Sequence, residues 1–270
     1  GNHVALGTDL YNVLETKFVD GLLWKYCYAT ITTPSDYSGS FNWYVGYGTV
    51  NTVGYRYYTN IQMELGSYPT AFVNGTRTTA NTILDLTNNN TITVSSLTYN
   101  SDGTFSFDGS SNSFYIPYID FSSAQTVEIW LKPTEADSAR RNPYNQAYGG
   151  YGTWTHEPNG AINYYYGDAG VNGSPYIGHT SNFTVGQNEI ACVCTTRDTS
   201  MSWWYKNGVQ YNSYTHSFGT LATDTNDIII GTGYAGAYLG NIYSVRLYNR
   251  ALTPSEVLQN FNALRGRFNI

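Results

Sequence analysis

Near its C-terminus the chain reads Gly240-Asn241-Ile242-Tyr243-Ser244-Val245-Arg246-Leu247-Tyr248-Asn249-Arg250-Ala251-Leu252-Thr253, and Pro254-Ser255-Glu256 follow directly. Residues 241–248 have the alternating, aromatic-rich pattern that is typical of a β-strand. Thr253 and Glu256 form a capping box in which each side chain can bind the backbone N–H of the other, and Pro254 stands where no N–H is needed. The apolar residues that follow lie on one helical stripe: Val257, Leu258, Phe261 and Leu264. The stretch predicts a strand followed by one helix that docks against a sheet.

The composition of the rest of the chain favours strands over helices. Tyr and Gly each supply 27 of the 270 residues, Thr, Ser and Asn are abundant, and there are only 2 Met. Tyr and Thr suit a pleated, half-buried surface, whereas Gly and Asn suit turns. The sequence therefore predicts an all-β protein.

Short strand-like runs alternate with turn dipeptides such as Asn159-Gly160 and Asn207-Gly208. The predicted strands are 24–32, 41–45, 55–64, 113–119, 126–132, 161–166, 189–196, 201–206, 227–230 and 241–248. Many short strands with frequent turns are typical of an antiparallel two-sheet jelly-roll sandwich, because two sheets must cover each other's apolar faces. A parallel α/β sheet is excluded because crossover helices are lacking.

A change in composition suggests how the chain is divided. Thr and Asn crowd together in 76–100, around a few apolar residues, which indicates a connector that lies along one domain as an irregular strand. Residues 101–270 are long enough for a complete sandwich, whereas 1–75 predict only a partial β domain. With no initiator Met, we expect the chain to be the C-terminal piece of something longer or a processed product.

Charge excludes one large class of partner. The chain carries 13 Lys+Arg against 19 Asp+Glu, a formal net charge of -6, so it offers no basic face to a phosphate backbone. Nucleic acid is not an expected partner. No apolar run approaches the ~18 residues that a membrane helix needs, and no signal peptide is evident, so we expect no membrane insertion.

The cysteines predict neither a disulfide framework nor a metal site. Cys192 and Cys194 are two residues apart on a predicted strand, so both point to one face and are badly placed to bridge each other. Their spacing fits no redox or zinc pattern. We expect both to be small buried hydrophobic residues.

One stretch matches a cofactor motif literally. Gly231-Thr232-Gly233-Tyr234-Ala235-Gly236 has the G-x-G-x-x-G spacing of dinucleotide-binding loops, but that motif requires a helix after it, and a strand is predicted here. We expect a turn and no nucleotide. The chain has no hydrolase elbow, zinc-protease, Walker or EF-hand motif, and His156 beside Glu157 is best explained as part of a solvated loop.

Glycoside hydrolysis needs two carboxylates that flank the scissile bond. Some jelly-roll glucanases carry them on a strand with the pattern E-x-D-x-x-E, whereas Glu128-Ile129-Trp130-Leu131-Lys132 has a single acid. The other acids considered stand in predicted loops: Asp168, Asp198, Asp224 and Asp227. We therefore expect a non-enzymatic protein without a catalytic residue or a cofactor.

Aromatic residues give the strongest positive signal. They cluster at Trp154, Tyr164, Tyr165, Tyr166, Tyr176, Trp203, Trp204 and Tyr205. Alternation along strands forces some of them outward, where flat rings beside polar side chains can bind sugars. As glycan-binding residues we predict Trp154, Tyr164 and Tyr166 with Asp168. A Tyr-rich surface equally suits packing against other subunits, and a homo-oligomer is the second expectation.

Five motifs, in order, resemble a laminin-G-like domain of the concanavalin A-like lectin/glucanase superfamily. They are Phe107-Asp108-Gly109, Glu128-Ile129-Trp130, Trp203-Trp204-Tyr205-Lys206-Asn207-Gly208, Ile228-Ile229-Ile230-Gly231 and the C-terminal stretch quoted above. The resemblance covers about 101–270 and implies a two-sheet antiparallel jelly roll closed by a short helix. It also implies a mostly non-catalytic module that binds glycans or proteins and sometimes calcium, although no calcium ligand can be assigned residue by residue.

An upstream segment, Tyr58-Thr59-Asn60-Ile61-Gln62-Met63-Glu64-Leu65-Gly66-Ser67-Tyr68-Pro69-Thr70-Ala71-Phe72 with Gly75-Thr76-Arg77, resembles the closing strand of a carbohydrate-binding-module-like jelly roll. Similar segments precede laminin-G-like domains in structural proteins of tailed bacteriophages. This resemblance implies a virion surface protein, in a capsid decoration or a tail fibre, whose partners are other virion proteins, itself or host surface glycans. The alternative is an extracellular protein, either a secreted bacterial lectin or an accessory module of a polysaccharide hydrolase.

Overall fold

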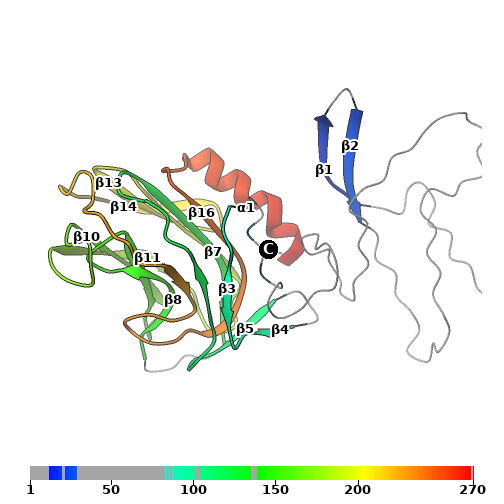
Figure 1. The fold of residues 1–270 in the computed structure, drawn as a ribbon. Coiled ribbons are helices and arrows are strands. Elements are labelled where there is room, and N and C mark those ends of the chain that lie inside the picture. Colours follow the sequence, from blue (N-terminus) through cyan, green and yellow to red (C-terminus); the bar gives the residue numbers. More distant parts are fainter. Residues whose placement is uncertain are drawn as a thin grey trace, which may run out of the picture. The chain divides into compact units, whose positions relative to one another are not determined.

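The computed structural model (Figure 1) divides the chain into two compact units, Gly1–Thr76 and Arg77–Ile270. It describes strands β1 (Asn12–Val19) and β2 (Leu22–Tyr28), residues 83, 85 and 87, and residues 89–100, 104–134, 139–268 and 270. In the first unit β1 and β2 pair as antiparallel strands, and β2 overlaps the predicted strand 24–32. The predicted strands 41–45 and 55–64, and with them most of the partial domain 1–75, lie outside the described residues.

The second unit is a sandwich of two antiparallel sheets, which confirms the predicted fold class. Sheet I has the strand order β11-β10-β9-β8-β15-β6-β3, and sheet II has the order β14-β13-β12-β7-β16-β5-β4. The strands of sheet I are β3 (Thr93–Ser95), β6 (Ser113–Ile116), β8 (Arg141–Ala147), β9 (Gly152–His156), β10 (Ala161–Gly167), β11 (Tyr176–Thr184) and β15 (Ile228–Ile230). Those of sheet II are β4 (Thr98–Tyr99), β5 (Phe105–Asp108), β7 (Gln125–Pro133), β12 (Ala191–Arg197), β13 (Met201–Lys206), β14 (Val209–Thr215) and β16 (Leu239–Tyr248).

The C-terminal stretch forms an interior strand of sheet II, next to its central strand β7. Strand β16 lies between β7 and β5, with Gly240 opposite both Phe107 and Pro133. The short strands β3 and β4 come from the segment 76–100 and pair at one edge of each sheet. This segment therefore contributes to both layers of the sandwich.

Strands β1 and β5 were not among the predicted strands. Every predicted strand from residue 113 onward overlaps a strand of the structure, but four strands in that part of the chain were missed: β8, β9, β11 and β14. These four carry many polar residues and glycines, so their sequences give little apolar alternation. Two of them, β11 and β14, are edge strands with one side open to solvent. Edge strands need less apolar surface than central ones, which explains the weak signal.

The core between the sheets is unusually rich in aromatic rings that also carry polar groups. Trp154 of sheet I contacts Trp204 of sheet II with ring centroids 5.2 Å apart. The buried hydroxyl of Tyr164 donates to Gln125 Oε1 at 2.8 Å, and that of Tyr166 donates to Ser202 Oγ at 3.0 Å. These hydrogen bonds compensate for the loss of water, so tyrosine can fill the core.

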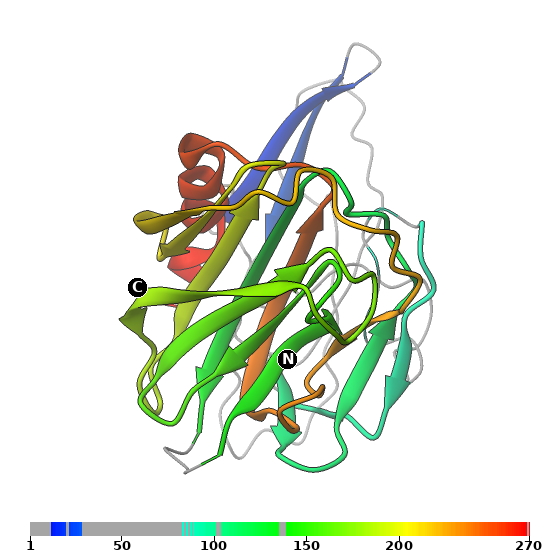
Figure 2. The same ribbon diagram turned by 90° about the vertical axis from the view of Figure 1, so that its left-hand side faces the viewer.

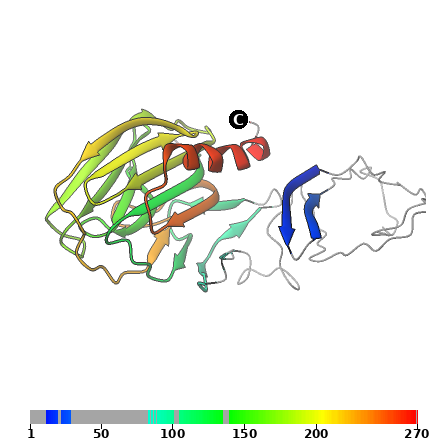
Figure 3. The ribbon, with the colours of Figure 1, turned by 90° about the horizontal axis from the view of Figure 1, so that it is seen from above.

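Helix α1 (Pro254–Phe268) covers the face of sheet II that is turned away from sheet I (Figures 1 and 3). The capping box is confirmed: Glu256 N donates to Thr253 Oγ1 at 3.4 Å, and Thr253 N donates to Glu256 Oε2 at 2.9 Å. Phe261 stacks on Trp130 with centroids 5.6 Å apart. The predicted stripe was wrong at Leu258, which is exposed because the neighbouring Val257 takes the buried position.

Three smaller expectations can be compared with the structure. Cys192 and Cys194 are buried free thiols on the helix side of sheet II, as predicted. The G-x-G-x-x-G stretch is a loop followed by strand β16, as predicted. The side-chain oxygen of Asn142 accepts the N–H groups of Ala235 and Gly236 at 2.5 and 3.2 Å, so these groups are already bonded and do not face a phosphate. In the described part of the chain no helix is long and apolar enough to cross a membrane.

Candidate functional site

Three of the four predicted glycan-binding residues lie inside the sandwich. Trp154, Tyr164 and Tyr166 are each 0% exposed and pack in the main core. They therefore cannot line an exposed groove, and that part of the prediction was wrong. Asp168 is exposed and follows β10, with its backbone N–H bonded to Pro175 O at 3.0 Å, beside the start of β11.

The physical reason for the error is the parity of strand β10. Ile162, Tyr164 and Tyr166 alternate onto the inner face, where Ile162 is also 0% exposed. The residues between them, Asn163 and Tyr165, must then point outward. The apolar Ile162 and the polar Asn163 were the signal in the sequence that could have assigned the two faces.

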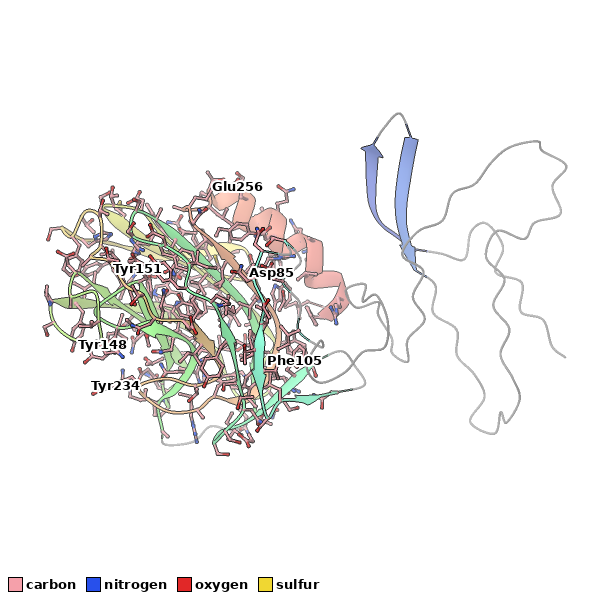
Figure 4. The ribbon with its side chains drawn as sticks, viewed as in Figure 1. Asp85, Phe105, Tyr148, Tyr151, Tyr234 and Glu256 are labelled. Atoms are coloured by element: carbon pink, nitrogen blue, oxygen red, sulfur yellow. The ribbon has the colours of Figure 1, made fainter. Side chains whose placement is uncertain are left out.

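The outward face of sheet I carries four tyrosines in ring contact, which we call the tyrosine row. Ring centroids are 6.2 Å apart for Tyr165 and Tyr176, 5.2 Å for Tyr176 and Tyr148, and 5.0 Å for Tyr148 and Tyr234. Figure 2 looks onto this sheet, whose green strands lie in front, and Figure 4 places Tyr148 and Tyr234 together on the side of the molecule away from Glu256 of α1. The row is solvent-accessible, and Tyr234 is 74% exposed.

Two of these tyrosines come from β10 and β11, and the other two come from loops. Tyr148 follows β8, and Tyr234 belongs to the loop 231–238, which crosses the outward face of β8. Gly233 allows the loop backbone to approach β8 closely, since a Cβ at this position would lie 2.7 Å from the Asn145 side chain. The loop covers Asn145 and Thr153, whose outward side chains are buried and bonded to each other at 2.6 Å. It leaves β10 and β11 open.

A shallow polar pocket of about 330 Å³ lies beside the tyrosine row. It is lined by Glu157, Pro158, Asn159, Ala161, Asn163 and Thr180. Glu157 Oε1 accepts hydrogen bonds from Asn163 Nδ2 at 2.7 Å and from Thr155 Oγ1 at 2.6 Å. Asn163 Oδ1 is buried and has no hydrogen-bond partner among the described residues. The exposed polar side chains of the pocket, those of Asn159 and Thr180, are the ones open to a ligand hydroxyl.

Arg140 links the pocket to the row. Its Nε lies 3.0 Å from Glu157, its Nη2 donates to the Tyr165 hydroxyl at 2.7 Å, and its guanidinium lies 5.5 Å from the Tyr165 ring centroid. Partial burial acts to lower the pKa of Arg140, but Tyr165 and Glu157 outweigh it and raise the pKa above its ordinary value. The arginine is therefore always cationic, and it holds both Glu157 and Tyr165 in place.

Apart from Asp168, the acids considered for catalysis lie elsewhere. Glu128 is 0% exposed beneath α1 and pairs with Arg246 at 2.9 Å; burial raises its pKa above the ordinary value despite the arginine. Asp224 is also buried, which raises its pKa, and its carboxylate accepts Asn226 N at 2.9 Å. Asp198 accepts the backbone N–H of Ser200 in a turn, and Asp227 accepts the backbone N–H of the distant Tyr118 at 3.2 Å. In the described part of the chain no three His, Cys, Asp or Glu side chains are grouped to hold a metal ion.

The fold and the site define a lectin-like β-sandwich domain. Residues 107–258 match the model of the concanavalin A-like lectin/glucanases superfamily described as Laminin_G_3, and the chain belongs to this family. A search among curated proteins found no match to the sequence.

Solved structures with a similar fold include receptor-binding domains of toxins. The receptor-binding domain of botulinum neurotoxin C/D mosaic serotype has a TM-score of 0.54 and 14% identity, over 64% of this chain and 46% of that one. The binding domain of Paraclostridial Mosquitocidal Protein 1 gives 0.52 and 18%, over 66% and 49%. The binding domain of botulinum neurotoxin DC in complex with rat synaptotagmin II gives 0.57 and 13%, over 68% and 49%. The match thus spans about half the length of these structures, and at such identities it shows a shared fold alone.

Proposed function

We propose that this domain binds glycans through the outward face of sheet I, with the tyrosine row and the adjoining polar pocket as the binding surface. The observation that carries the proposal is the contact between the row and the pocket: Arg140 bonds to both Tyr165 and Glu157. Exposed aromatic rings next to a few convergent polar groups are the usual composition of a small-ligand site. A sugar has the matching pattern, since it offers apolar C–H faces and hydroxyl groups.

In this arrangement the tyrosine rings stack on sugar faces and the pocket binds hydroxyls. The exposed side chains of Thr180 and Asn159, which line the pocket, can donate to or accept from ligand hydroxyls. Asp168 stands beside Tyr176 at the end of the row and remains a predicted ligand contact. Because the rings follow one another over three contacts, the site suits an extended glycan chain better than a single sugar.

The site supports a binding role rather than catalysis. Glu157 is the only acid among the residues that line the pocket, and its oxygens already accept from Arg140, Thr155 and Asn163. Glycoside hydrolysis would need a second carboxylate on the other side of the bond. We expect no turnover of any glycan that binds and no cofactor, so addition of EDTA should leave the affinity unchanged. EDTA-sensitive binding would instead indicate calcium.

A glycan array followed by calorimetry with a soluble monovalent oligosaccharide tests the proposal. Tyr176→Ala should weaken binding by at least about tenfold, or about 1.4 kcal/mol. Tyr211→Ala is the matched control, because Tyr211 is 48% and Tyr176 45% exposed but Tyr211 lies on β14 of sheet II. Absence of binding to any glycan, or equal losses in both variants, would contradict the proposal. If the domain binds a protein but no glycan, the proposed ligand class is a protein instead of a glycan.

We further propose that the domain is displayed on the virion surface of a tailed phage, as a capsid decoration or a tail component, and attaches to host glycans or to other virion proteins. The resemblance of 58–77 to phage structural proteins and the low charge of the chain support this role. Mass spectrometry and immunogold labelling of purified particles should detect the chain. Its absence from particles, with recovery from the medium of a bacterial culture, would favour the extracellular lectin or the hydrolase accessory module.

A further inference from the structure

Among the described residues, strand β14 forms a long open edge of sheet II. It pairs with β13 on one side and is the last strand in the order of that sheet. Its sequence, Val209–Thr215, contains no charged residue and no proline. Natural proteins usually protect edge strands with such residues, because the free N–H and C=O groups of an edge can pair with another strand. The edges at the opposite side, β3 and β4, are only three and two residues long.

Exposed apolar side chains gather at the same edge. Val209 is 58%, Tyr211 48% and Tyr214 42% exposed, and all three belong to β14. Leu258 of helix α1, which is 45% exposed, adjoins the start of the strand, since a Cβ on Gly208 would lie 2.9 Å from its Cδ1. Half of the eight large exposed hydrophobic residues in the described part of the chain therefore lie here.

The strand also has internal features that fix its shape. A bulge between β13 and β14 turns Tyr211 toward Phe183, with ring centroids 5.0 Å apart. Asn212 Nδ2 donates to Thr180 O at 2.9 Å, which ties β14 to β11 across the side of the sandwich. The edge is thus held in one conformation before any partner arrives, which lowers the entropic cost of pairing.

We propose that β14 pairs antiparallel with β14 of a second copy of this chain, which joins two copies of sheet II into one continuous sheet. An antiparallel edge is self-complementary under a twofold axis, because each free N–H meets a C=O of the other copy. Identical charged strands would repel each other, whereas this strand carries no charge although the chain has 32 charged residues, 13 basic and 19 acidic. Val209 and Leu258 are buried on dimer formation.

Sedimentation velocity of the full chain, from micromolar to hundreds of micromolar concentration, tests the proposal. The wild type should form a concentration-dependent dimer. Two variants should each weaken dimerisation by at least about tenfold. Ser213→Lys brings like charges together on the exposed edge, and Val209→Lys places a charge where an apolar side chain is buried in the dimer. Val171→Lys is the matched control: Val171 is 57% exposed but lies in the loop between β10 and β11, so its dimer should equal the wild type.

Thermal melting must show that the variants are folded, and glycan titration with a monovalent sugar should be unchanged by Ser213→Lys, since the tyrosine row lies on the other sheet. A wild type that is monomeric at every concentration would overturn the proposal, and so would coverage of β14 by another part of the same chain, which gives the same monomer. Dimers that tolerate both lysine substitutions would overturn it as well.

Discussion

Tyr165 lies directly over Gly178. The two residues are opposite each other on β10 and β11, and a Cβ on Gly178 would lie only 2.9 Å from Tyr165 Cε1. The absence of a side chain at Gly178 thus allows the Tyr165 ring to lie flat on the sheet, where Arg140 holds its hydroxyl. One end of the tyrosine row is therefore positioned by a glycine on the neighbouring strand.

Gly178→Ala should displace Tyr165 and weaken glycan binding by about tenfold, or about 1.4 kcal/mol. The free energy of unfolding should change by less than about 1 kcal/mol, because the ring is partly exposed and can move away. Calorimetry and urea unfolding measure the two effects. Gly266→Ala is the control, since a Cβ there meets nothing within 4 Å and the position is helical; it should leave affinity unchanged. Equal affinity in Gly178→Ala would show that Tyr165 does not contact the ligand.

Stability should fall in mild acid because of His179. Burial lowers the pKa of His179 from 6.5 to about 4, so the folded state favours the neutral ring, which is 3% exposed and bonds to Ser202 Oγ at 2.7 Å. The folded protein then binds fewer protons than the unfolded chain below pH 6.5, and up to about 3 kcal/mol of stability is lost between pH 6.5 and 4.

Urea unfolding over that pH range checks the expectation, and His179→Gln should flatten the pH dependence. Burial also lowers the pKa of His216, so part of the slope should remain in the single variant and be smaller in His179→Gln/His216→Gln, where carboxyls such as Glu256, whose pKa is lowered to about 2, still contribute at the acidic end. A wild type whose midpoint stays constant from pH 6.5 to pH 4.5 would contradict the predicted burial of the neutral rings.

The sequence was sufficient for the architecture because the decisive signals were local. The capping box from Thr253 to Glu256 and the alternation in β16 depend on residues within a few positions of each other, and both were confirmed. Strand β8 was missed because its outward polar residue Asn145 is covered by a loop that comes more than eighty residues later. Burial of that kind depends on the tertiary fold, and the pattern of a single strand does not reveal it.

The sequence predicted that aromatic residues form the candidate site, but not which of them. Tyr165 and Tyr176 belonged to the aromatic cluster that the sequence singled out, but the inward-facing Tyr164 and Tyr166 were selected in their place. A shift of one residue along a strand exchanges the two faces, so this one wrong assignment moved the expected site into the core. Tyr234 comes from a distant loop, and only the fold brings it to the row.

The two residues of the ion pair beneath helix α1 should depend on each other, so that removal of one partner alone destabilises the fold. Arg246 is bonded to the fully buried Glu128 at 2.9 Å and to Asn260 O of the helix at 3.1 Å. Arg246→Leu should lower the free energy of unfolding by about 3 kcal/mol, because it leaves a buried carboxylate without a counter-charge. Since the pKa of Glu128 is already raised, the loss should shrink as the pH falls and Glu128 takes up a proton.

The double variant Glu128→Leu/Arg246→Leu distinguishes the loss of the ion pair from the cost of an unpaired buried carboxylate. It should be much more stable than Arg246→Leu alone at neutral pH, and its stability should no longer depend on the protonation of residue 128. Chemical denaturation at neutral and acidic pH measures both. A single variant as stable as the wild type would mean that water reaches Glu128 in solution.

The capping box should account for part of the stability of α1. Thr253→Ala removes the hydroxyl that accepts from Glu256 N and should cost about 1 kcal/mol in urea unfolding. Thr253→Ser keeps the acceptor and should cost much less. Because α1 covers Trp130, fluorescence should report the same transition. Equal losses for both substitutions would assign the effect to the Thr253 methyl group instead of the cap.

The last prediction concerns the polar pocket. Asn163→Asp keeps the size of the side chain but replaces the Nδ2 group that donates to Glu157 Oε1 at 2.7 Å, so two carboxylates come together. At neutral pH their repulsion should distort the pocket and weaken glycan binding by at least about tenfold; at acidic pH a shared proton should restore part of the affinity. Asn159→Asp is the matched control, because Asn159 lines the same pocket but its Oδ1 accepts from Ala161 N, which a carboxylate can do equally well. Calorimetry at two pH values should therefore separate the variants, and an equal loss in both would mean that added negative charge, rather than the Asn163–Glu157 contact, controls binding.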